Sequence, residues 1–595
     1  MKLKVTVASL MLLMADNLWA QDEPYFTIET INVVADNALY GPYPVAMSDD
    51  EDFIATYSLK ASLSSNVDIG LPFTFNRECQ YDSVICELEF YGSENSSLSS
   101  YYNAYQVWRN AQADADDGSY ESYMMANTLS GLSDNGMVVP FDLGAYDTDV
   151  KVTDVYTSSA GVKYIIGYSS APYSDGERDF VRRAFIQTLD GSTVSLMPEF
   201  TSDGGFSSAY KIQEVGDTVV VIGASSRSYP QDDDEYFDYC FNSDETDDIY
   251  DVNDLVYCPG FDTQAWAWDV TDIVNNGATS TELTGAALAT TWLEDNTENQ
   301  DDLTYSANAF DINSAGTAVG ASTFEYSDSA EGARQRAIIM TPTDGVYGEA
   351  VEITAATDDI SSQEDSIYNT WAVTISEAGL VTGNRDYDAV KTRNKPTEFF
   401  VYDSSTDGVE IPFLNKKVAT TKQRLANDSY YVAKSGANSR VYDANESDWM
   451  VGEVDDYDQT DPVYGASPRI QSAFLYDNTE NQAWLINDLI CSQSDGVVTS
   501  PLIRIISARV ISDTNVVLAN GYVYDTNDDY TDRTNGVQTS FKLTPNSALS
   551  PNDSPNCWES DLHSSDDDTY EREGGATLWL WIFALPLVFI RRFKR

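Results

Sequence analysis

The chain has 595 residues, and 34 Lys and Arg stand against 96 Asp and Glu, a formal net charge of −62. A field of this sign repels nucleic acids and anionic membrane surfaces and attracts cations, so nucleic acid is excluded as a partner. A solubility adaptation to salty water would produce the same acidity, because salt screens the repulsion. With 42% hydrophobic and 12% aromatic residues, the chain nevertheless has the composition of a protein with a large packed core.

Residues 1–20 have the order of a secretory signal peptide. Lys2 and Lys4 precede an apolar run, and Ala20 stands directly before a polar stretch. We expect signal peptidase to cut after Ala20, which would place the rest of the chain outside the cytoplasm. The alternative is a buried N-terminal strand or helix, in which the two lysines would be unfavourable.

Residues 21–545 predict a mostly β body, because Tyr, Thr and Val are common and long helical periodicity is scarce. A two-part unit repeats along it: a turn followed by a strand ending in Gly, then an acidic loop and a second strand. The glycines are Gly167, Gly223, Gly320, Gly383, Gly452 and Gly521. Weaker copies lie at 47–55 and 132–139.

Six to eight such units predict an all-β fold, a β-propeller-like array of repeated blades. One four-stranded unit cannot bury both of its faces, whereas neighbouring blades can do so for each other. A pair of β-sandwiches or an open β-solenoid is the alternative.

The units resemble the HAF-type extracellular repeat, in which a His-Ala-Phe strand follows a Val-Gly strand. Here the histidine is replaced, in order, by Arg183, Gln264, Arg336, Glu398, Ser472 and Thr539. The chain as a whole also resembles a family of unknown function found in secreted proteins of marine proteobacteria. That resemblance implies location and architecture, and no particular chemistry.

Six cysteines in an exported chain favour disulfides, although they allow 15 connectivities. The pairing that is local in sequence is Cys79–Cys86, Cys240–Cys258 and Cys491–Cys557. Because zinc-type spacing is absent and the chain has one histidine, a zinc site is not expected.

That histidine, His563, lies in a polar stretch, which is a poor place for a catalytic base. Mechanisms that need a histidine beside Ser or Cys are therefore disfavoured. Carboxylate catalysis, as in glycoside hydrolysis, stays open, but 96 acids give no basis for choosing a pair.

Acidic, tyrosine-containing loops follow the repeated glycines, and we expect them to share one face. Such a rim could bind calcium, a surface glycan or a protein partner, or could simply be solvated turns. Asp525, Asn527 and Asp529 alternate as the oxygen ligands of a calcium loop do, and calcium is the one cofactor that the sequence suggests. The loop lacks the usual Gly at its sixth position and Glu at its twelfth.

The C-terminal end begins with an acidic linker over 546–573. Gly574 and Gly575 follow, then an uncharged apolar helix over 576–590 and a basic cluster. This order resembles the GlyGly-CTERM sorting signal of Gram-negative bacteria. The resemblance implies a transient inner-membrane anchor, cleavage near Gly574-Gly575 by a rhombosortase-type protease, and attachment at the cell surface. An ordinary C-terminal membrane anchor is the alternative.

Together these features predict a secreted, surface-attached, non-catalytic repeat protein that acts as an interaction or envelope scaffold. The alternative is an extracellular hydrolase or lyase that acts on polysaccharide through carboxylates. A tight group of acids with Tyr or Arg in a deep pocket would favour the enzyme.

Overall fold

The fold was analysed in a computed structural model of the chain. The structure describes residues 23–31, 33, 38–60, 127–132, 136–141, 150–170, 173–174, 177–180, 182–228, 261–289, 306–324, 334–354, 367–387, 397–413, 439–455, 471–494, 497–499, 501–532 and 534–554.

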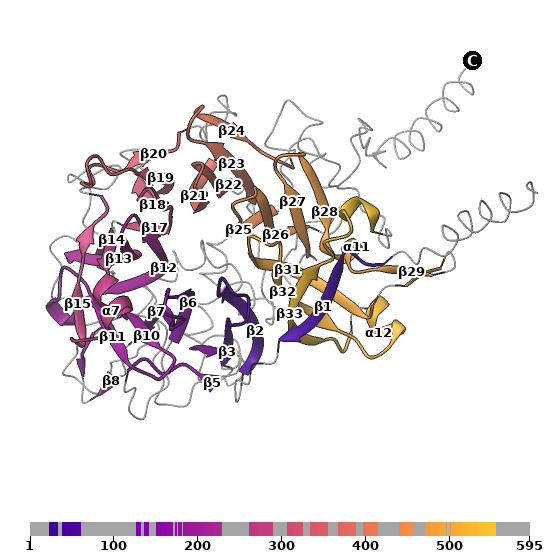
Figure 1. The fold of residues 1–595 in the computed structure, drawn as a ribbon, viewed down its shortest axis with the longest axis horizontal. Helices are drawn as coiled ribbons and strands as arrows, with labels where there is room; N and C mark the ends of the chain where they lie inside the picture. The colour runs from indigo at the N-terminus through magenta and orange to yellow at the C-terminus, as the bar shows by residue number, and fades with distance from the viewer. Residues whose placement is uncertain are drawn as a thin grey trace, which may run out of the picture.

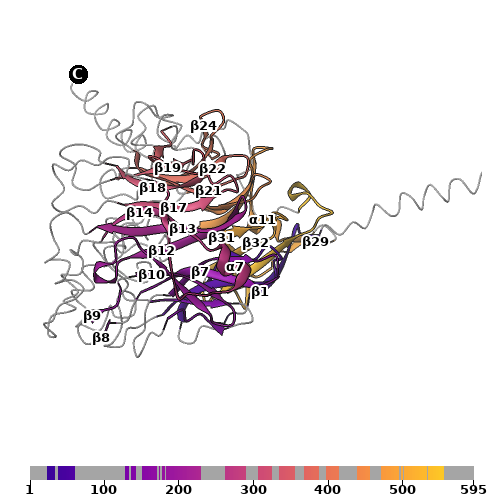
Figure 2. The same ribbon diagram turned by 60° about the vertical axis from the view of Figure 1, so that its left-hand side comes forward.

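Seven sheets, each built around four antiparallel strands, are arranged radially around a common axis (Figures 1 and 2). We number the blades 1 to 7 along the chain. Their innermost strands are β2 (Ala38–Met47), β6 (Val150–Thr157), β12 (Ser207–Val215), β17 (Ala307–Ile312), β21 (Ile367–Ile375), β25 (Ser439–Ala444) and β31 (Ile503–Ile511). The molecule is a seven-bladed β-propeller. This confirms the predicted all-β propeller and excludes the sandwich pair and the open solenoid.

The second and third strands of each blade continue outward as hairpins. The second strands are β3 (Ile54–Lys60), β7 (Lys163–Ser170), β13 (Thr218–Ser228), β18 (Ala318–Phe324), β22 (Leu380–Tyr387), β26 (Trp449–Asp455) and β32 (Val517–Val523). The third strands are β4 (Asn127–Leu132), β10 (Arg182–Thr188), β14 (Asp262–Asp269), β19 (Arg334–Met340), β23 (Thr397–Asp403), β27 (Gln471–Asp477) and β33 (Val537–Pro545).

The outer strands of blades 1 to 6 are short: β5 (Gly136–Met137), β11 (Thr193–Met197), β16 (Ala286–Ala287), β20 (Val351–Glu352), β24 (Gly408–Glu410) and β28 (Gln482–Leu485). Between blades 2 and 3, helix α7 (Thr271–Asn276) leads into β15 (Glu282–Thr284), which pairs in parallel with β11. Two small hairpins, β8 (Tyr173–Ser174) with β9 (Glu177–Arg178) and β29 (Ser492–Ser494) with β30 (Val497–Thr499), lie outside the blades.

Both ends of the described chain close the ring at blade 7. Strand β1 (Phe26–Ile31) is the outer strand of that blade and pairs antiparallel with β33. The next segment, 546–554, belongs to the predicted linker and is tied down: the amide of Asn546 donates to the carbonyl of Tyr25, and the Asn552 side chain donates to Gln482 in blade 6. Closure therefore depends on residues more than 500 positions apart.

Each innermost strand carries a β-bulge at the same level. The register shifts lie between Pro44 and Ala46, Val152 and Asp154, Ala209 and Lys211, Ala309 and Asp311, Ala372 and Thr374, Val441 and Asp443, and Ala508 and Val510. A bulge leaves one residue unpaired and turns its side chain out of the ladder. In the propeller these seven residues face the axis, because all of them line the central cavity.

The repeated glycines lie inside the second strands, not at their ends, and in blades 2 to 6 they pair with the residue directly before the bulge, where blades 1 and 7 carry Thr56 and Ala519. Gly452 pairs with Val441, directly before the bulge, and a Cβ on it would lie 1.9 Å from the carbonyl oxygen of Arg440. Gly167, Gly223, Gly320 and Gly383 pair with the equivalent residues. In blade 7 the glycine, Gly521, is displaced to an additional bulge between Ile505 and Ser507.

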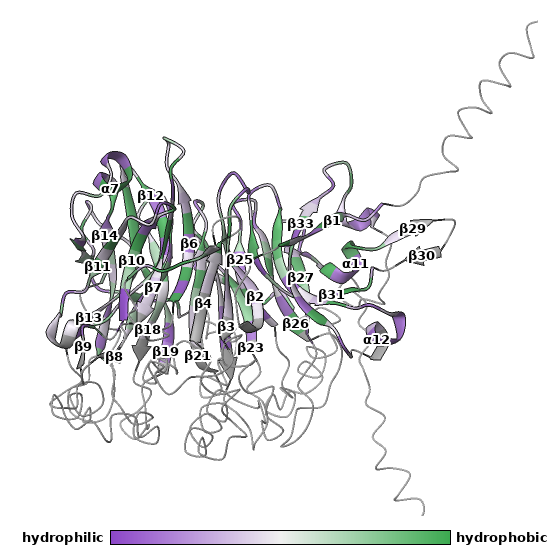
Figure 3. Cartoon of the chain, turned by 90° about the horizontal axis from the view of Figure 1, so that it is seen from below, coloured by the Kyte–Doolittle hydropathy of each residue, from purple (hydrophilic) through white to green (hydrophobic). Residues whose placement is uncertain are grey.

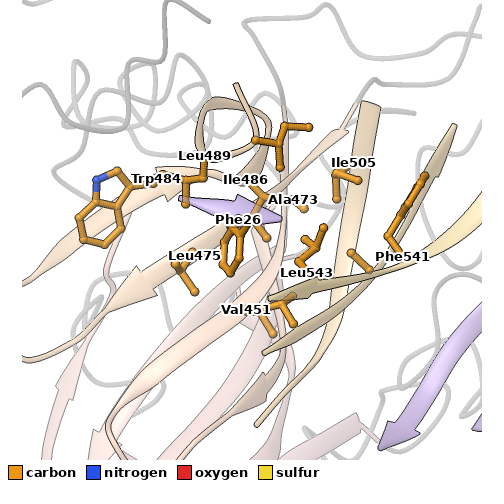
Figure 4. Close-up of a cluster of buried hydrophobic side chains, with 14 of the residues drawn as sticks. Phe26, Val451, Ala473, Leu475, Trp484, Ile486, Leu489, Ile505, Phe541 and Leu543 are labelled. Carbon is orange, nitrogen blue, oxygen red and sulfur yellow. The ribbon is translucent and has the colours of Figure 1, made fainter. Parts of the chain in front are cut away.

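The core consists of apolar layers between neighbouring blades. Figure 4 shows the layer between blades 6 and 7, where Val451, Ala473 and Leu475 face Ile505, Phe541 and Leu543. Phe26 of β1 and helix α11 (Ile486–Leu489) complete this cluster. These layers fix the blades around the axis and thereby position the cavity.

Candidate functional site: the central cavity

The seven innermost strands enclose a cavity of about 780 Å³ on the propeller axis. The unpaired bulge residues form one layer of its wall: Val45, Thr153, Tyr210, Phe310, Val373, Tyr442 and Arg509. The residues that follow them form the next layer: Ala46, Asp154, Lys211, Asp311, Thr374, Asp443 and Val510. The wall holds nine carboxylic acids and three basic residues, so it is strongly acidic.

Three aspartates occupy equivalent positions on blades 2, 4 and 6 and make the same pair of hydrogen bonds. One oxygen of Asp443 accepts the amide of Ala444 at 2.9 Å, and the other accepts the amide of Ile511, on blade 7, at 2.9 Å. Asp311 accepts the amides of Ile312 and of Ile375 on blade 5. Asp154 likewise accepts those of Val155 and of Ile212 on blade 3. Each carboxylate thus connects its blade to the next one.

Blade 3 carries Lys211 at the position where these blades carry aspartate. Its ammonium lies 3.4 Å from Asp154, while 38% of the side chain stays exposed to the cavity. The carboxylates of Asp154, Asp311 and Asp443 all raise the pKa of Lys211, and Asp154 has the largest effect. Lys211 therefore places an alkylammonium group of the chain itself among these carboxylates.

Asp311 and Asp443 are not ion-paired with Lys211 in this way. Burial raises the pKa of Asp311 to about 6 and that of Asp443 to about 7. Lys211 and the backbone hydrogen bonds oppose the rise. Desolvation exceeds the available compensation at both carboxylates, so burial favours their protonated form, and a nearby cation would favour the charged form.

Aromatic and basic side chains line the cavity at positions that precede the aspartate layer along the innermost strands. The ammonium of Lys151 lies 5.0 Å from the ring centre of Tyr57, and the guanidinium of Arg509 lies 4.1 Å from that of Tyr442. Tyr210 and Phe310 meet edge to face at 5.1 Å. Trp371 completes the aromatic part of the wall.

At the other end of these strands the first hairpin turns of the blades form an acidic mouth, which we define as Asp49, Glu51, Glu377, Glu446 and Asp513. In Figure 3 the upper edge, where the hairpins of β6 and β25 turn, contains hydrophilic segments. Nearby acids and burial raise the pKa of Asp49 and of Glu446, with burial the larger cause in both.

Hydrogen bonds or an ion pair bridge every junction between blades at the level of the mouth. Acids of one turn accept from the turn of the preceding blade: Glu377 from the Ser314 amide, Glu446 from that of Glu377, and Asp513 from that of Glu446. The remaining junctions are bridged by Ser512 with Glu51, Asp50 with Lys163, Tyr156 with Glu214, and the Gly216 amide with the Ser314 carbonyl. The bridges form a closed ring around the mouth.

The structure places the predicted calcium residues at the outer part of blade 7, away from this cavity. Asp525 precedes helix α12 (Asn527–Asp532), which contains Asn527 and Asp529. The Asp529 carboxylate accepts from Thr526, Thr534 and Asn535, and these hydrogen bonds lower its pKa. Within the described residues no group of three His, Cys, Asp or Glu side chains is arranged to hold a metal ion. Calcium binding here stays a prediction.

Several other predicted residues lie outside the described part of the chain. These are the processing residues Ala20, Gly574 and Gly575, the apolar helix 576–590, and Cys79, Cys86, Cys240, Cys258 and Cys557. Cys491 is buried directly after α11. The disulfide pairing and the processing stay predictions. Among the described residues, no helix is long and apolar enough to cross a membrane.

The cavity residues were missed by sequence reasoning, although a signal for them was present. Asp311 and Asp443 each stand two residues before an asparagine, Asn313 or Asn445, whose side chain closes the first turn of its blade. Acids inside that turn, such as Glu446, belong to the same repeated unit. The acidic rim was instead predicted on the loops after the repeated glycines. Most of those loops lie outside the described residues.

A family model described as protein of unknown function (DUF3466) matches residues 2–593. The chain belongs to this family. Its members carry no assigned activity in that description, and no curated protein matches the chain.

Solved structures resemble the DUF3466 chain weakly. An acylaminoacyl peptidase from Pyrococcus horikoshii is 10% identical, with a TM-score of 0.31 over 82% of this chain and 51% of the peptidase. The chain thus spans about half the length of that protein. An inulosucrase from Halalkalicoccus jeotgali bound to kestose is 9% identical, with a TM-score of 0.29 over 66% and 91%. A polysaccharide lyase, Uly1, is 8% identical, with a TM-score of 0.27 over 64% and 88%. Similarities at this level carry no information on activity.

Proposed function

We propose that this protein is an exported, surface-attached, non-catalytic binding scaffold. The observation that supports it is the use of the cavity carboxylates. Both oxygens of Asp154, Asp311 and Asp443 accept backbone amides, one of them from the next blade. These bonds fix the carboxylates in the wall as links between blades, which suits a rigid binding surface, while each oxygen keeps a second lone pair that a ligand can contact.

The proposed location rests on the two chain ends. A cut after Ala20 would leave β1 complete, because that strand begins at Phe26. Intact-mass analysis of surface-released protein tests the processing. The expected mass starts at Gln21 and ends near Gly574-Gly575, whereas recovery of the complete Arg595 end would leave an ordinary membrane anchor.

One observation favours a second function, a carboxylate-dependent polysaccharide hydrolase or lyase. The raised pKa values of Asp311 and Asp443, about 6 and about 7, fall in the range that suits a general acid near neutral pH. Tyr442 and Arg509 lie beside them in the wall.

The two functions are separated by product formation. The mature protein is incubated with neutral and acidic polysaccharides, and reducing ends and unsaturated sugars are measured over time. The scaffold predicts no product above that of the Asp443→Asn variant. Turnover that Asp443→Asn abolishes, while Asp344→Asn on an exposed outer turn retains it, would establish the enzyme.

A further inference from the structure

The charges in the cavity wall are unbalanced in a specific way. Asp154 has Lys211 as its cation at 3.4 Å, but Asp311 on blade 4 and Asp443 on blade 6 have no comparable ion pair within the part of the chain that the structure describes. Both are partly buried, and burial disfavours an unpaired carboxylate. A positive charge near these two blades would reduce this cost.

The wall is better suited to an organic cation than to a metal ion. No three acids among the described residues are arranged to chelate one ion, so the negative charge is spread along the wall. Between Asp311 and Asp443 the wall also presents the partly exposed rings of Phe310 and Tyr442, the second with the guanidinium of Arg509 4.1 Å from its centre. Aromatic faces attract ammonium groups and cover their alkyl parts, and a volume of about 780 Å³ lies in the ordinary range for small-molecule pockets.

Lys211 provides an internal example of such a cation. It is an alkylammonium group on a flexible chain, it lies in this wall, and the three aspartates stabilise its charged form. A ligand of the same chemistry would meet the same field. It would enter past the acidic mouth, where Glu377 and Glu446 are exposed.

From this geometry we propose that the central cavity binds a small organic cation of the alkylammonium class, held between Asp311 and Asp443 against the aromatic wall. Lys211 acts as an internal competitor, because its ammonium, which is paired with Asp154, interacts electrostatically with the same carboxylates. The proposal rests on the proposed function, since it names the ligand class that the scaffold would take.

The experiment uses isothermal titration calorimetry on the mature protein, with 1,4-diaminobutane and tetramethylammonium as probes. Sodium chloride at matched ionic strength, calcium chloride and glucuronate serve as comparison ligands. We expect saturable binding of at least one ammonium probe, weakened roughly tenfold by Asp443→Asn, because one charge of the site is removed. The matched control Asp344→Asn removes one exposed charge outside the cavity and should leave the affinity unchanged.

Lys211→Gln is the more informative variant, because it keeps all the aspartate-to-backbone hydrogen bonds. Removal of the competing ammonium should tighten binding of the probes by roughly three- to tenfold. Weaker binding in Lys211→Gln would overturn the proposal, and so would glucuronate binding that this variant abolishes, since both would mean that Lys211 holds an anionic ligand. Heats equal to those of sodium chloride, or binding of calcium alone, would also overturn it. Failure of the scaffold function would appear separately, as turnover of polysaccharide.

Discussion

The apolar layer between blades 6 and 7 and the polar contacts around the cavity hold the same two blades together by different means. We call these polar contacts, which are the aspartate-to-backbone hydrogen bonds of the wall and the bridges at the mouth, the polar ring. In the layer, Leu475 of one blade packs with Phe541 of the other, and the gain grows with buried area without demanding a direction. In the ring, Asp443 accepts the amide of Ile511 at 2.9 Å, which requires one orientation of the two strands.

The apolar layers mainly contribute stability, whereas the hydrogen bonds of the ring mainly set the orientation of the blades. Burial of one large apolar side chain contributes about 1.5–3 kcal/mol, whereas a typical hydrogen bond contributes a net 0.5–1.5 kcal/mol, roughly half as much. The layers therefore supply most of the free energy that keeps the blades together. The ring fixes the angle between blades, and its buried carboxylates carry an electrostatic cost, visible in the raised pKa values of Asp311 and Asp443.

The largest effect is expected from breaking the apolar layer. Phe541→Ala removes a fully buried ring between blades 6 and 7 and should lower the free energy of unfolding by about 3–5 kcal/mol. Urea unfolding followed by fluorescence measures it, and Phe541→Leu, which keeps most of the volume, should cost clearly less. A loss below about 1 kcal/mol for the alanine variant would contradict the assignment of cohesion to the layers.

A smaller loss of stability is expected from substituting the glycine of a second strand that lies opposite the bulge of the innermost strand. In Gly452→Ala the new Cβ would lie 1.9 Å from the carbonyl oxygen of Arg440, so the bulge must shift, at a cost of about 1–3 kcal/mol. Gly348→Ala is the matched control, because a Cβ there meets nothing within 4 Å. Equal stability of the two variants would mean that the bulge does not require glycine.

A change of pH distinguishes the polar ring from the apolar layers, because only the ring contains carboxyl groups that titrate. The pKa of Asp443 in the folded protein, about 7, lies above its ordinary value of 3.8, so the folded state binds the proton more tightly than the unfolded state. Its contribution is most favourable below pH 4 and is lost as the pH rises through about 7. Asp311 acts in the same direction up to about pH 6.

Thermal unfolding of the wild type and of Asp443→Asn from pH 4 to pH 8 tests this sign. The variant should be less stable than the wild type at pH 4, because one of the two amides loses its acceptor, and the difference should shrink as the pH rises. A difference that is independent of pH would show that Asp443 titrates in the folded protein as it does in the unfolded chain.

The smallest effect is expected at the mouth. Glu377→Gln keeps an oxygen that can accept from Ser314, and the side chain is exposed, so the change in stability should stay within about 0.5 kcal/mol. Chemical denaturation in low salt and in high salt measures it. A loss comparable to that of Gly452→Ala would mean that the ring of turns contributes cohesion as well as orientation.

Much of the architecture could be predicted because it is encoded locally. The spacing of Gly167, Gly223, Gly320, Gly383 and Gly452 marks one repeated position, and the propeller confirms the all-β array. Each glycine was predicted to end its strand, but it lies inside the second strand. The bulge opposite it is in the innermost strand, and the sequence of the second strand does not reveal that bulge. Gly521 fitted the repeat by sequence, yet its two-residue displacement required an additional bulge that only strand pairing revealed.

The sequence by itself determined the β class, the repetition and the acidic character, because composition and short-range patterns carry them. Only the tertiary structure decided the number of blades, the closure by β1 and the meeting of Asp154, Lys211, Asp311 and Asp443 in one cavity. Those four residues span almost 300 positions of the chain, and nothing local to any of them indicates the others. They line one cavity because each directly follows the unpaired bulge residue of its innermost strand, and the common axis around which these strands lie exists only once the ring has closed.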